Sequence, residues 1–450
     1  MAISALDSSI FRNLFGTQEM RNIFADEAYV RRMIEVEAAL ARAQSETGVI
    51  APDIGTQLTE AITSVPLDFE KLSRDTDIVG YPVLPLVEQL VSGTAPEVAK
   101  YIHWGATTQD IMDNASMLQI RQGLQVVKRE LNDLISLLRG LSQQYRDTPM
   151  AGRTHLQHAL PCTFGYKCAV YLSSMVRNVE RLNEIEARCL LVQFGGAAGT
   201  LASLGTTDDG IRVRAKLADE LHLRDPPITW HSVRDNIAEI LNFLALVGGL
   251  LGKIAYDVMI MSSNEFGEVS EPFVPHRGAS STMPQKRNPI SSEVILAASK
   301  ILRSHASLGL DAMVVDFERA SGPWHLEWVA IPEAFVLAAG ALHQTNFVFG
   351  GLVVNTGAMM ENLNSTKGLI VGEAVMMALA RHIGRQPAHD VVYSACKNSI
   401  ETGKLLFDVL RLSSEVNSNI SEEELAKLCD PRNYFGSNQL MADNMVRISA

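Results

Sequence analysis

Cysteine and aromatic residues are scarce in this chain of 450 residues. There are five cysteines, and no two of them form a Cys-x-x-Cys pair. So few thiols in a long chain predict reduced cysteines rather than a disulfide framework, and we expect no metal site built from them. Aromatic residues make up 6% of the chain, whereas alanine and leucine are abundant, which favours helix over strand.

An excess of positive charge is also absent. Lysine and arginine number 39 against 51 acidic residues, so the net charge is 39 − 51 = −12. Binding to nucleic acid needs a basic surface, so this class of partner is not expected. If the ligand is an anion, the positive charge that binds it must be local.

Targeting and membrane segments are not predicted. Residues 1–15 lack a basic stretch followed by an apolar one, so we expect no signal peptide and a cytoplasmic protein. The most apolar run, residues 240–261, contains Asn242, Lys253 and Asp257. These charged and polar residues favour a buried helix over a membrane span.

Alternating strand patterns are scarce, and helical periodicity dominates. Apolar residues recur at helical spacing in six long stretches: 29–47, 111–141, 164–192, 235–261, 292–308 and 332–353. A helix of 30 residues is about 45 Å long, so such helices must pack on one another as a bundle. Their broad apolar coverage indicates further packing between subunits.

Four segments between these helices are expected to be loops: residues 148–161, 194–229, 268–289 and 317–332. The second contains the run from Gly195 to Gly199. This run does not follow a predicted strand, so a dinucleotide-binding turn is not expected. Close packing of helices, or contact between its backbone and a ligand, explains the glycines better.

The third segment carries the richest chemistry, in residues 278–289. Small residues at its start allow the backbone to approach a ligand and to move as a lid. Lys286 and Asn288 are suited to binding a carboxylate while a serine hydroxyl reaches a reacting carbon. The alternative is a polar surface loop with unrelated basic residues.

Residues 103–110 read His-Trp-Gly-Ala-Thr-Thr-Gln-Asp, directly before the long helix expected from residue 111. Thr107 and Thr108 offer hydroxyls, and a helix N-terminus offers amides, to an anion. The alternative is an ordinary helix cap formed by Asp110.

Histidines and arginines mark three further segments. His155, in Gly-Arg-Thr-His-Leu-Gln-His, is suited to proton transfer near neutral pH, although a lone loop histidine is more often structural. Arg234 either forms a structural ion pair or belongs to a site. Arg319 offers bidentate binding of a carboxylate, the alternative being a solvated surface side chain, and it precedes Trp324-His325-Leu326-Glu327-Trp328.

Together these segments resemble the fumarase/aspartase superfamily. Residues 278–289 are similar to its signature Gly-Ser-Ser-x-Met-Pro-x-Lys-x-Asn-Pro, with Ala279 where the superfamily usually has glycine. Thr108 stands where the superfamily usually has serine. The segment Trp-His-Leu-Glu-Trp resembles the bacterial 3-carboxy-cis,cis-muconate cycloisomerases within this superfamily.

The resemblance implies an all-α fold of three domains. These are an N-terminal helical domain at residues 1–110, a central bundle of long helices at 111–365 and a small C-terminal helical domain at 366–450. It also implies a homotetramer in which each active site gathers loops from several subunits. The surplus of apolar helix faces is consistent with such an assembly.

The implied reaction is the cycloisomerisation of 3-carboxy-cis,cis-muconate, or a 3-sulfo analogue, to a muconolactone in the protocatechuate branch of aromatic catabolism. The substrate is a small di- or tricarboxylate, and neither metal nor cofactor is expected. By resemblance, Ser280 handles the proton at carbon, Lys286 stabilises its oxyanion and His155 orients or protonates a carboxylate. The substrate-binding residues are expected to be Thr107, Thr108, Asn288, Arg319, His103, Trp324 and His325.

Two other functions stay open. One is a C–N lyase of the adenylosuccinate lyase type, which releases fumarate, although Trp324 and His325 stand where a nucleotide site needs phosphate-binding residues. The other is a catalytically silent structural protein on the same scaffold. Retention of Ser280, Lys286, Asn288 and His155 argues against it.

Overall fold

The computed structural model describes residues 3–319 and 322–449. The chain forms two compact units, each assembled from three stretches of sequence. The first unit comprises Met1–Glu130, Val179–Leu251 and Ala297–His343, and the second comprises Leu131–Asn178, Gly252–Leu296 and Gln344–Ala450. The predicted division at residues 110 and 365 stays a prediction.

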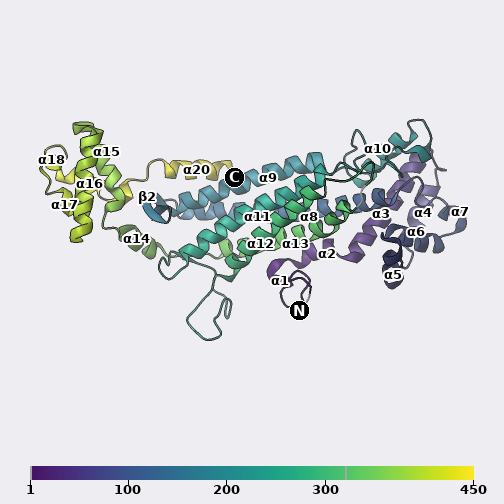
Figure 1. The fold of residues 1–450 in the computed structure, drawn as a ribbon, viewed down its shortest axis with the longest axis horizontal. Helices are drawn as coiled ribbons and strands as arrows, with labels where there is room; N and C mark the ends of the chain where they lie inside the picture. The colour runs from purple at the N-terminus through teal and green to yellow at the C-terminus, as the bar shows by residue number, and fades with distance from the viewer. Residues whose placement is uncertain (1–2, 320–321, 450) are drawn as a thin grey trace. The chain divides into compact units, whose positions relative to one another are not determined.

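Five long helices supply the frame, and each has residues in both units. They are labelled in Figure 1. They are α8 (Thr108–Gln144), α9 (Phe164–Cys189), α11 (Asp235–Met261), α12 (Ile290–Asp311) and α13 (Pro323–Gly350). The predicted all-α fold is therefore confirmed. Within the first unit α11 packs closely on α12, where a Cβ added to Gly248 would lie 2.4 Å from Leu302.

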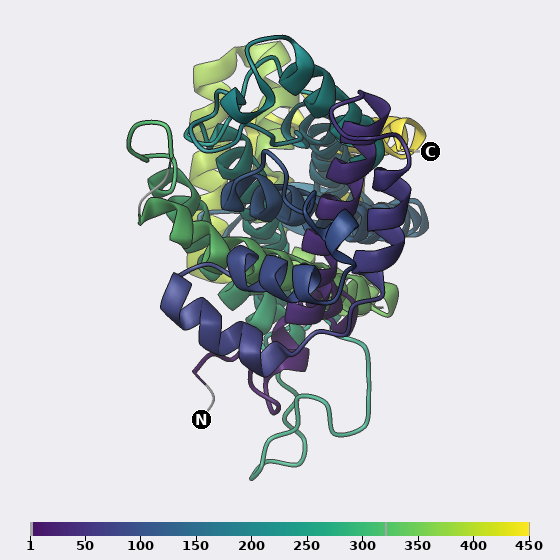
Figure 2. The ribbon, with the colours of Figure 1, turned by 90° about the vertical axis from the view of Figure 1, so that its right-hand side faces the viewer.

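The remaining helices of the first unit are short, apart from α3 and α10. They are α1 (Arg12–Phe15), α2 (Gln18–Ile23), α3 (Asp26–Glu46), α4 (Ile54–Thr63), α5 (Phe69–Val79), α6 (Val83–Ser92), α7 (Pro96–Ala99), the 3₁₀ turn Ala202–Leu204 and α10 (Asp209–Leu221). Figure 2 shows several of these helices facing the viewer.

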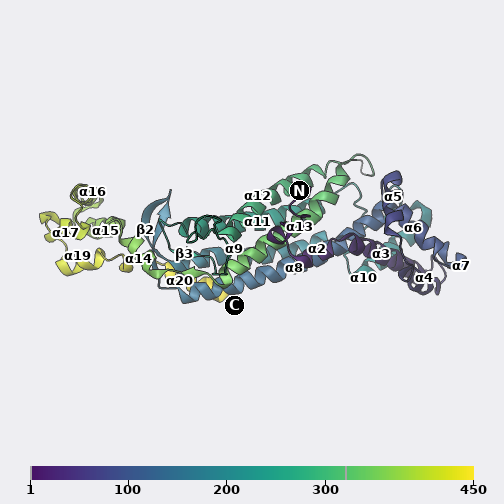
Figure 3. The same ribbon diagram turned by 90° about the horizontal axis from the view of Figure 1, so that it is seen from below.

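The second unit holds all four described strands, in two antiparallel pairs. They are β1 (Pro149–Thr154) with β2 (Gln157–Thr163), and β3 (Val269–Ser270) with β4 (Val353–Val354). Its other elements are α14 (Thr356–Asn364), the 3₁₀ turns Leu369–Val371 and Pro431–Asn433, α15 (Gly372–Ile383), α16 (Arg385–Thr402), α17 (Leu406–Leu410), α18 (Ser414–Asn417), α19 (Glu422–Leu428) and α20 (Asn438–Ile448). Helices α15–α19 gather around a hydrophobic core of their own (Figure 3).

Four sequence predictions about local structure are wrong. Helix α13 begins at Pro323, so Pro332 lies inside the helix rather than near its start, and most of the loop predicted at 317–332 is helical. Proline fits the first helical position because its missing N–H is not needed there, which makes Pro323 the start signal. Residues 148–161 belong to the β1–β2 hairpin, and α10 occupies part of the loop predicted at 194–229.

Two helices among the described residues, α11 and α13, are long and apolar enough to cross a membrane by length and composition. In their most apolar stretches, 61% and 67% of the residues are buried inside the protein. Helices in the core of a folded protein show the same pattern.

Candidate active site

The predicted site residues fall into two groups, one in each unit. The first unit holds His103, Thr107, Thr108, Arg319, Trp324 and His325, and the second holds His155, Ser280, Lys286 and Asn288.

The first group is centred on the start of α8. Thr107 directly precedes Thr108, the first residue of the helix, and its hydroxyl accepts a hydrogen bond from the guanidinium of Arg319. Arg319 is exposed, and Thr107 is half-buried. A hydroxyl, a cation and the N-terminus of a long helix therefore meet at one accessible point, where an anion is favoured.

His103 is a second basic side chain in this region, and it pairs with Glu37. Its Nδ1 lies 2.7 Å from Oε1 of Glu37, and its backbone N–H donates to Oε2 at 3.0 Å. Burial lowers the pKa of His103, but the hydrogen bond to Glu37 and the charges of Glu37 and Asp110 outweigh burial and raise this pKa above its ordinary value. Since Glu37 is buried, His103 is held in a fixed orientation.

Asp110 makes more contacts than the helix cap that the sequence suggests. Its carboxylate, with a side chain only 1% exposed, accepts the backbone N–H groups of Thr107, Gly195 and Gly196, each at 3.0 Å. It also pairs with Nε2 of His231 at 2.7 Å. The sequence alone does not reveal this cluster, because His231 lies 121 positions from Asp110.

Trp324 and His325 belong to an aromatic cluster at the start of α13. The ring of Tyr81 lies 5.9 Å from Trp324, 5.8 Å from His325 and 5.9 Å from Trp328, measured between centroids. His325 and Trp328 are closer still, at 4.2 Å. Tyr81 was not predicted; the one sequence signal for it is an aromatic residue between Gly80 and Pro82, at the turn before α6.

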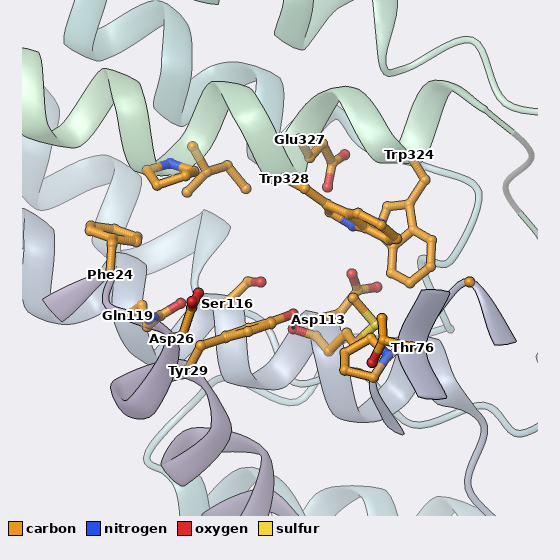
Figure 4. A pocket seen from close by; sticks show the side chains of 15 residues that line it. Phe24, Asp26, Tyr29, Thr76, Asp113, Ser116, Gln119, Trp324, Glu327 and Trp328 are labelled. Atoms are coloured by element: carbon orange, nitrogen blue, oxygen red, sulfur yellow. Dashed lines mark hydrogen bonds between the residues drawn. The ribbon is translucent and has the colours of Figure 1, made fainter. Parts of the chain in front are cut away.

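A cavity of about 310 Å³ lies beside Trp324 and Trp328 (Figure 4). Across it, Tyr29 faces α13, and Asp113 and Glu327 lie on its walls. Asp26 is a third carboxyl group in the lining, and Arg234 offsets the charge of only one, so this cavity is a poor place for a di- or tricarboxylate.

The contacts of Arg234 decide between a structural ion pair and a role in the site. Its guanidinium donates to Asp113 at 2.8 and 2.9 Å and to Glu327 at 2.9 and 2.5 Å, and its side chain is 1% exposed. Burial raises the pKa of Glu327, although the charge of Arg234 opposes this effect. Arg234 therefore forms a buried ionic triad that joins α8, α11 and α13.

In the second unit, the Ser280 segment lies in the long loop between α11 and α12 (Figures 1 and 2). The Oγ of Ser280 accepts the N–H groups of Thr282, at 3.3 Å, and Met283, at 3.1 Å. Two backbone amides thus point at the oxygen proposed to carry negative charge, which is the arrangement that stabilises an oxyanion.

Gly278 closes the base of this loop. It has φ of +70°, and its carbonyl accepts the N–H of Asn288 at 2.9 Å. Ala279, the departure from the signature, forms a bridge with Arg287 and is not among the described residues with positive φ. The alanine therefore fits without backbone strain. Lys286 is exposed, and Asn288 is half-buried beside a polar cavity of about 180 Å³.

His155 lies at the tip of the β1–β2 hairpin. His155 and Leu156 have φ of +53° and +62°, between the paired residues Thr154 and Gln157. Two central residues with positive φ define a type I′ turn, which glycine and asparagine normally occupy. Non-glycine residues pay roughly 1–2 kcal/mol each in this conformation, so the tip is strained, as residues at functional sites often are.

The hairpin is anchored below its tip. Arg153 forms a bidentate pair with Glu268, at 3.0 and 2.7 Å, and the carboxylate of Glu268 also accepts from Asn362 at 2.9 Å. Among the described residues, no hydrogen bond joins His155 to the Ser280 loop. The structure thus groups Thr107 with Arg319, and the loop residues with one another, but it does not bring the whole predicted set together within either unit.

Comparisons with known proteins show the family of this chain. The family model described as "Lyase" matches residues 14–302, and that described as "Adenylosuccinate lyase C-terminus" matches residues 368–445. Trans-aconitate decarboxylase 1 of Mycosarcoma maydis is 44% identical over 96% of this chain and 88% of its own. The 3-carboxy-cis,cis-muconate cycloisomerase of Acinetobacter baylyi is 40% identical over 98% of both chains.

A solved structure is similar to this chain over nearly its whole length. The fumarate lyase of Mesorhizobium sp. BNC1 shares 52% identity, with a TM-score of 0.91 over 96% of this chain and 98% of its own. Because these matches span nearly the whole chain, the protein belongs to the fumarase/aspartase superfamily.

Proposed function

We propose that this enzyme is a cycloisomerase that converts 3-carboxy-cis,cis-muconate, or its 3-sulfo analogue, to the corresponding muconolactone. The observation that carries the proposal is the pairing of Arg319 with the Thr107 hydroxyl at the start of α8, and the aromatic cluster of Trp324 and Trp328 at the start of α13 supports it. The cycloisomerase of Acinetobacter baylyi, 40% identical, supports it as well. We place the reaction in the cytoplasm, in the protocatechuate branch of aromatic catabolism.

The reaction needs positioning, charge stabilisation and one proton. A substrate carboxylate oxygen forms a bond to one carbon of a double bond, and the π electrons move toward a second carboxylate. Ser280 then gives its proton to the neighbouring carbon, and the loop amides with Lys286 stabilise the serine oxyanion until solvent reprotonates it. Thr107, Thr108, Arg319 and Asn288 hold the carboxylates.

The assembly belongs to the proposal. We propose a homotetramer in which the strained tip at His155 enters a site formed by other subunits. The two residues of this tip, His155 and Leu156, are exposed, Leu156 to 66%. Both can therefore contact another copy of the chain. His155 then orients or protonates a carboxylate of the substrate.

A second candidate is decarboxylation of trans-aconitate, favoured by the 44% identity to the enzyme from Mycosarcoma maydis. Both candidate substrates are unsaturated tricarboxylates, and both reactions deliver a proton to carbon. Here the bond to one carboxyl carbon breaks, carbon dioxide leaves, and the electron pair left behind takes up the proton.

Mass-resolved turnover separates these candidates. The purified protein would be offered 3-carboxy-cis,cis-muconate, its 3-sulfo analogue, trans-aconitate and adenylosuccinate separately, with a chelator present. A product of unchanged mass from either muconate supports the cycloisomerase, and loss of carbon dioxide from trans-aconitate supports the second candidate. Fumarate from adenylosuccinate, with the other three substrates unchanged, would overturn both.

A further inference from the structure

Asp110 lies where three segments of the first unit meet. Its Oδ2 accepts the N–H groups of Thr107 and Gly196, and its Oδ1 accepts the N–H of Gly195 and pairs with Nε2 of His231. The start of α8, the glycine run and His231, in the segment before α11, are thereby joined through one buried carboxylate.

The helix cap formed by Asp110 changes the role of Thr107. In a capping box, the threonine before a helix accepts an N–H with its hydroxyl, and the third helical residue returns the bond to the threonine N–H. Here the carboxylate of Asp110, the third residue of α8, accepts the N–H of Thr107 as in a capping box. The N–H of Asp110, however, donates to the backbone carbonyl of Thr107, at 3.0 Å, and not to its hydroxyl. The hydroxyl of Thr107 is therefore not used for capping and pairs with Arg319 instead.

The glycine run is pressed against neighbouring backbone. Gly196 has φ of +70°, and an added Cβ would lie 3.1 Å from the carbonyl oxygen of Gly105. Gly199 has φ of +77°, and its added Cβ would lie 2.9 Å from the hydroxyl of Thr229. Between these glycines, Ala197 and Ala198 are exposed. The run is thus a turn that lies next to the Thr107 segment and faces outward.

His231 completes the cluster from the buried side, with a side chain 2% exposed. Its Nδ1 has no hydrogen-bond partner within residues 3–319 and 322–449, so Nε2 makes its one bond, to Asp110. Since the carboxylate already accepts three amides, the proton lies on Nε2 of the histidine. At this depth His231 cannot reach a substrate.

We infer that Asp110 and His231 are positioning residues, which hold the Thr107–Thr108 segment and the Gly195–Gly199 turn side by side as one surface for a substrate carboxylate. This inference rests on the proposed function in one respect, namely that the substrate is a polycarboxylate. It adds the glycine turn to the substrate site and gives Asp110 a role beyond a helix cap.

Two similar variants test the role of His231. The amide nitrogen of glutamine in His231→Gln can take the place of Nε2 and donate to Asp110, whereas the shorter side chain of His231→Asn cannot reach it. We expect His231→Asn to lower kcat/KM by about tenfold and His231→Gln to stay within about threefold of the parent. Asp208→Asn, at an exposed side chain of the same unit, is the control and should leave kcat/KM unchanged.

Coupling to Thr107 separates positioning from a general loss of stability. If His231 acts through Thr107, its substitution to asparagine should change kcat/KM by less than about threefold in a Thr107→Val background, because coupled residues are not additive. Hydrogen exchange gives a second readout that does not depend on turnover. The amides of Thr107, Gly195 and Gly196 should exchange faster in His231→Asn than in His231→Gln.

Two failures can be told apart. If the parent turns over neither a muconate nor trans-aconitate, the proposed function is wrong, and hydrogen exchange still decides whether His231 holds the two segments. If both His231 variants show the same exchange and the same kcat/KM, or if the effects of His231→Asn and Thr107→Val are additive, the inference is wrong.

Discussion

Arg319 donates a hydrogen bond to the hydroxyl of Thr107, although 212 positions separate these residues in the chain. The contact places a guanidinium at the N-terminus of α8, where the helix dipole also favours negative charge. A protein with a net charge of −12 can thus present a positive surface to an anion at one point. The pKa of His103, four residues before Thr107 in the chain, is raised, which favours its charged form.

Arg319 is the first residue to test by substitution. Arg319→Lys keeps the charge but loses the planar fork that binds a carboxylate through two bonds, so we expect KM to rise by about tenfold with a smaller change in kcat. Steady-state kinetics with the active substrate measures this. Arg74→Lys, at an exposed side chain on α5, is the control and should match the parent. An unchanged KM in Arg319→Lys would argue against carboxylate binding by this residue.

Ser280 carries the proposed proton transfer. We expect Ser280→Ala to lower kcat by about a thousandfold, in the range found for loss of general acid catalysis, while the protein still binds substrate. Ser281→Ala removes the neighbouring hydroxyl and serves as the matched control, with activity close to that of the parent. If the two variants lost activity equally, the loop would matter for its shape rather than for the hydroxyl of Ser280.

Much of the helical frame can be predicted from apolar periodicity. The predicted helix at 235–261 matches α11, and the ends predicted for α8, at 111 and 141, lie three residues from those observed. The boundary of α13 was missed because two prolines, at 323 and 332, both give a start signal, and the sequence does not show which is the first helical residue. Helix α13 continues through Pro332.

The contacts that organise the site could not be predicted from one sequence. Asp110 reaches the glycine run and His231, and Arg234 reaches Asp113 and Glu327, across 85 to 121 positions. Each residue has an ordinary local explanation, as a helix cap or as the first charges of a helix. Their long-range role depends on how the helices pack, which periodicity alone does not give.

The raised pKa of His103 predicts a pH dependence. A raised pKa means that the folded protein binds the proton more tightly than the unfolded chain. The stability from this pair is therefore present below the ordinary value of 6.5 and is lost as pH rises through the raised pKa. Because the positive charge lies near the Thr107 site, KM for a polyanionic substrate should rise over the same pH range.

Two variants test this pH dependence. His103→Gln removes the titrating group, so the rise in KM above pH 6.5 should disappear while KM at low pH becomes higher. Glu37→Gln removes the carboxylate that raises the pKa, so the rise should move to lower pH. A pH profile of KM that is the same in the parent and in both variants would show that His103 does not act on the substrate through its charge.

The buried triad predicts an asymmetric effect on stability. Arg234→Met leaves Asp113 and Glu327 buried without their cation, and removal of one partner from a buried ion pair costs about 3–5 kcal/mol. The triple substitution with Asp113→Asn and Glu327→Gln removes the uncompensated charges, so we expect it to recover part of the loss. Urea unfolding followed by circular dichroism measures both. Equal midpoints for the single and the triple variant would contradict this explanation.

Gly278 and Ala279 are neighbours with opposite requirements, so they form a matched pair for the Ser280 loop. A Cβ at Gly278 would lie 2.3 Å from the carbonyl oxygen of Asn288, and its φ of +70° is one that alanine adopts at a cost of roughly 1–2 kcal/mol. Gly278→Ala should therefore displace Asn288 and lower kcat/KM by about a hundredfold, the effect of misplacing a substrate-positioning group by about 1 Å. Ala279→Gly restores the residue more usual in the superfamily, and because Ala279 shows no positive φ, kcat/KM should change by less than about threefold. Steady-state kinetics of the two variants measures both effects. A large effect of Ala279→Gly would mean that the loop adopts another backbone conformation during turnover, in which residue 279 needs the conformational freedom of glycine.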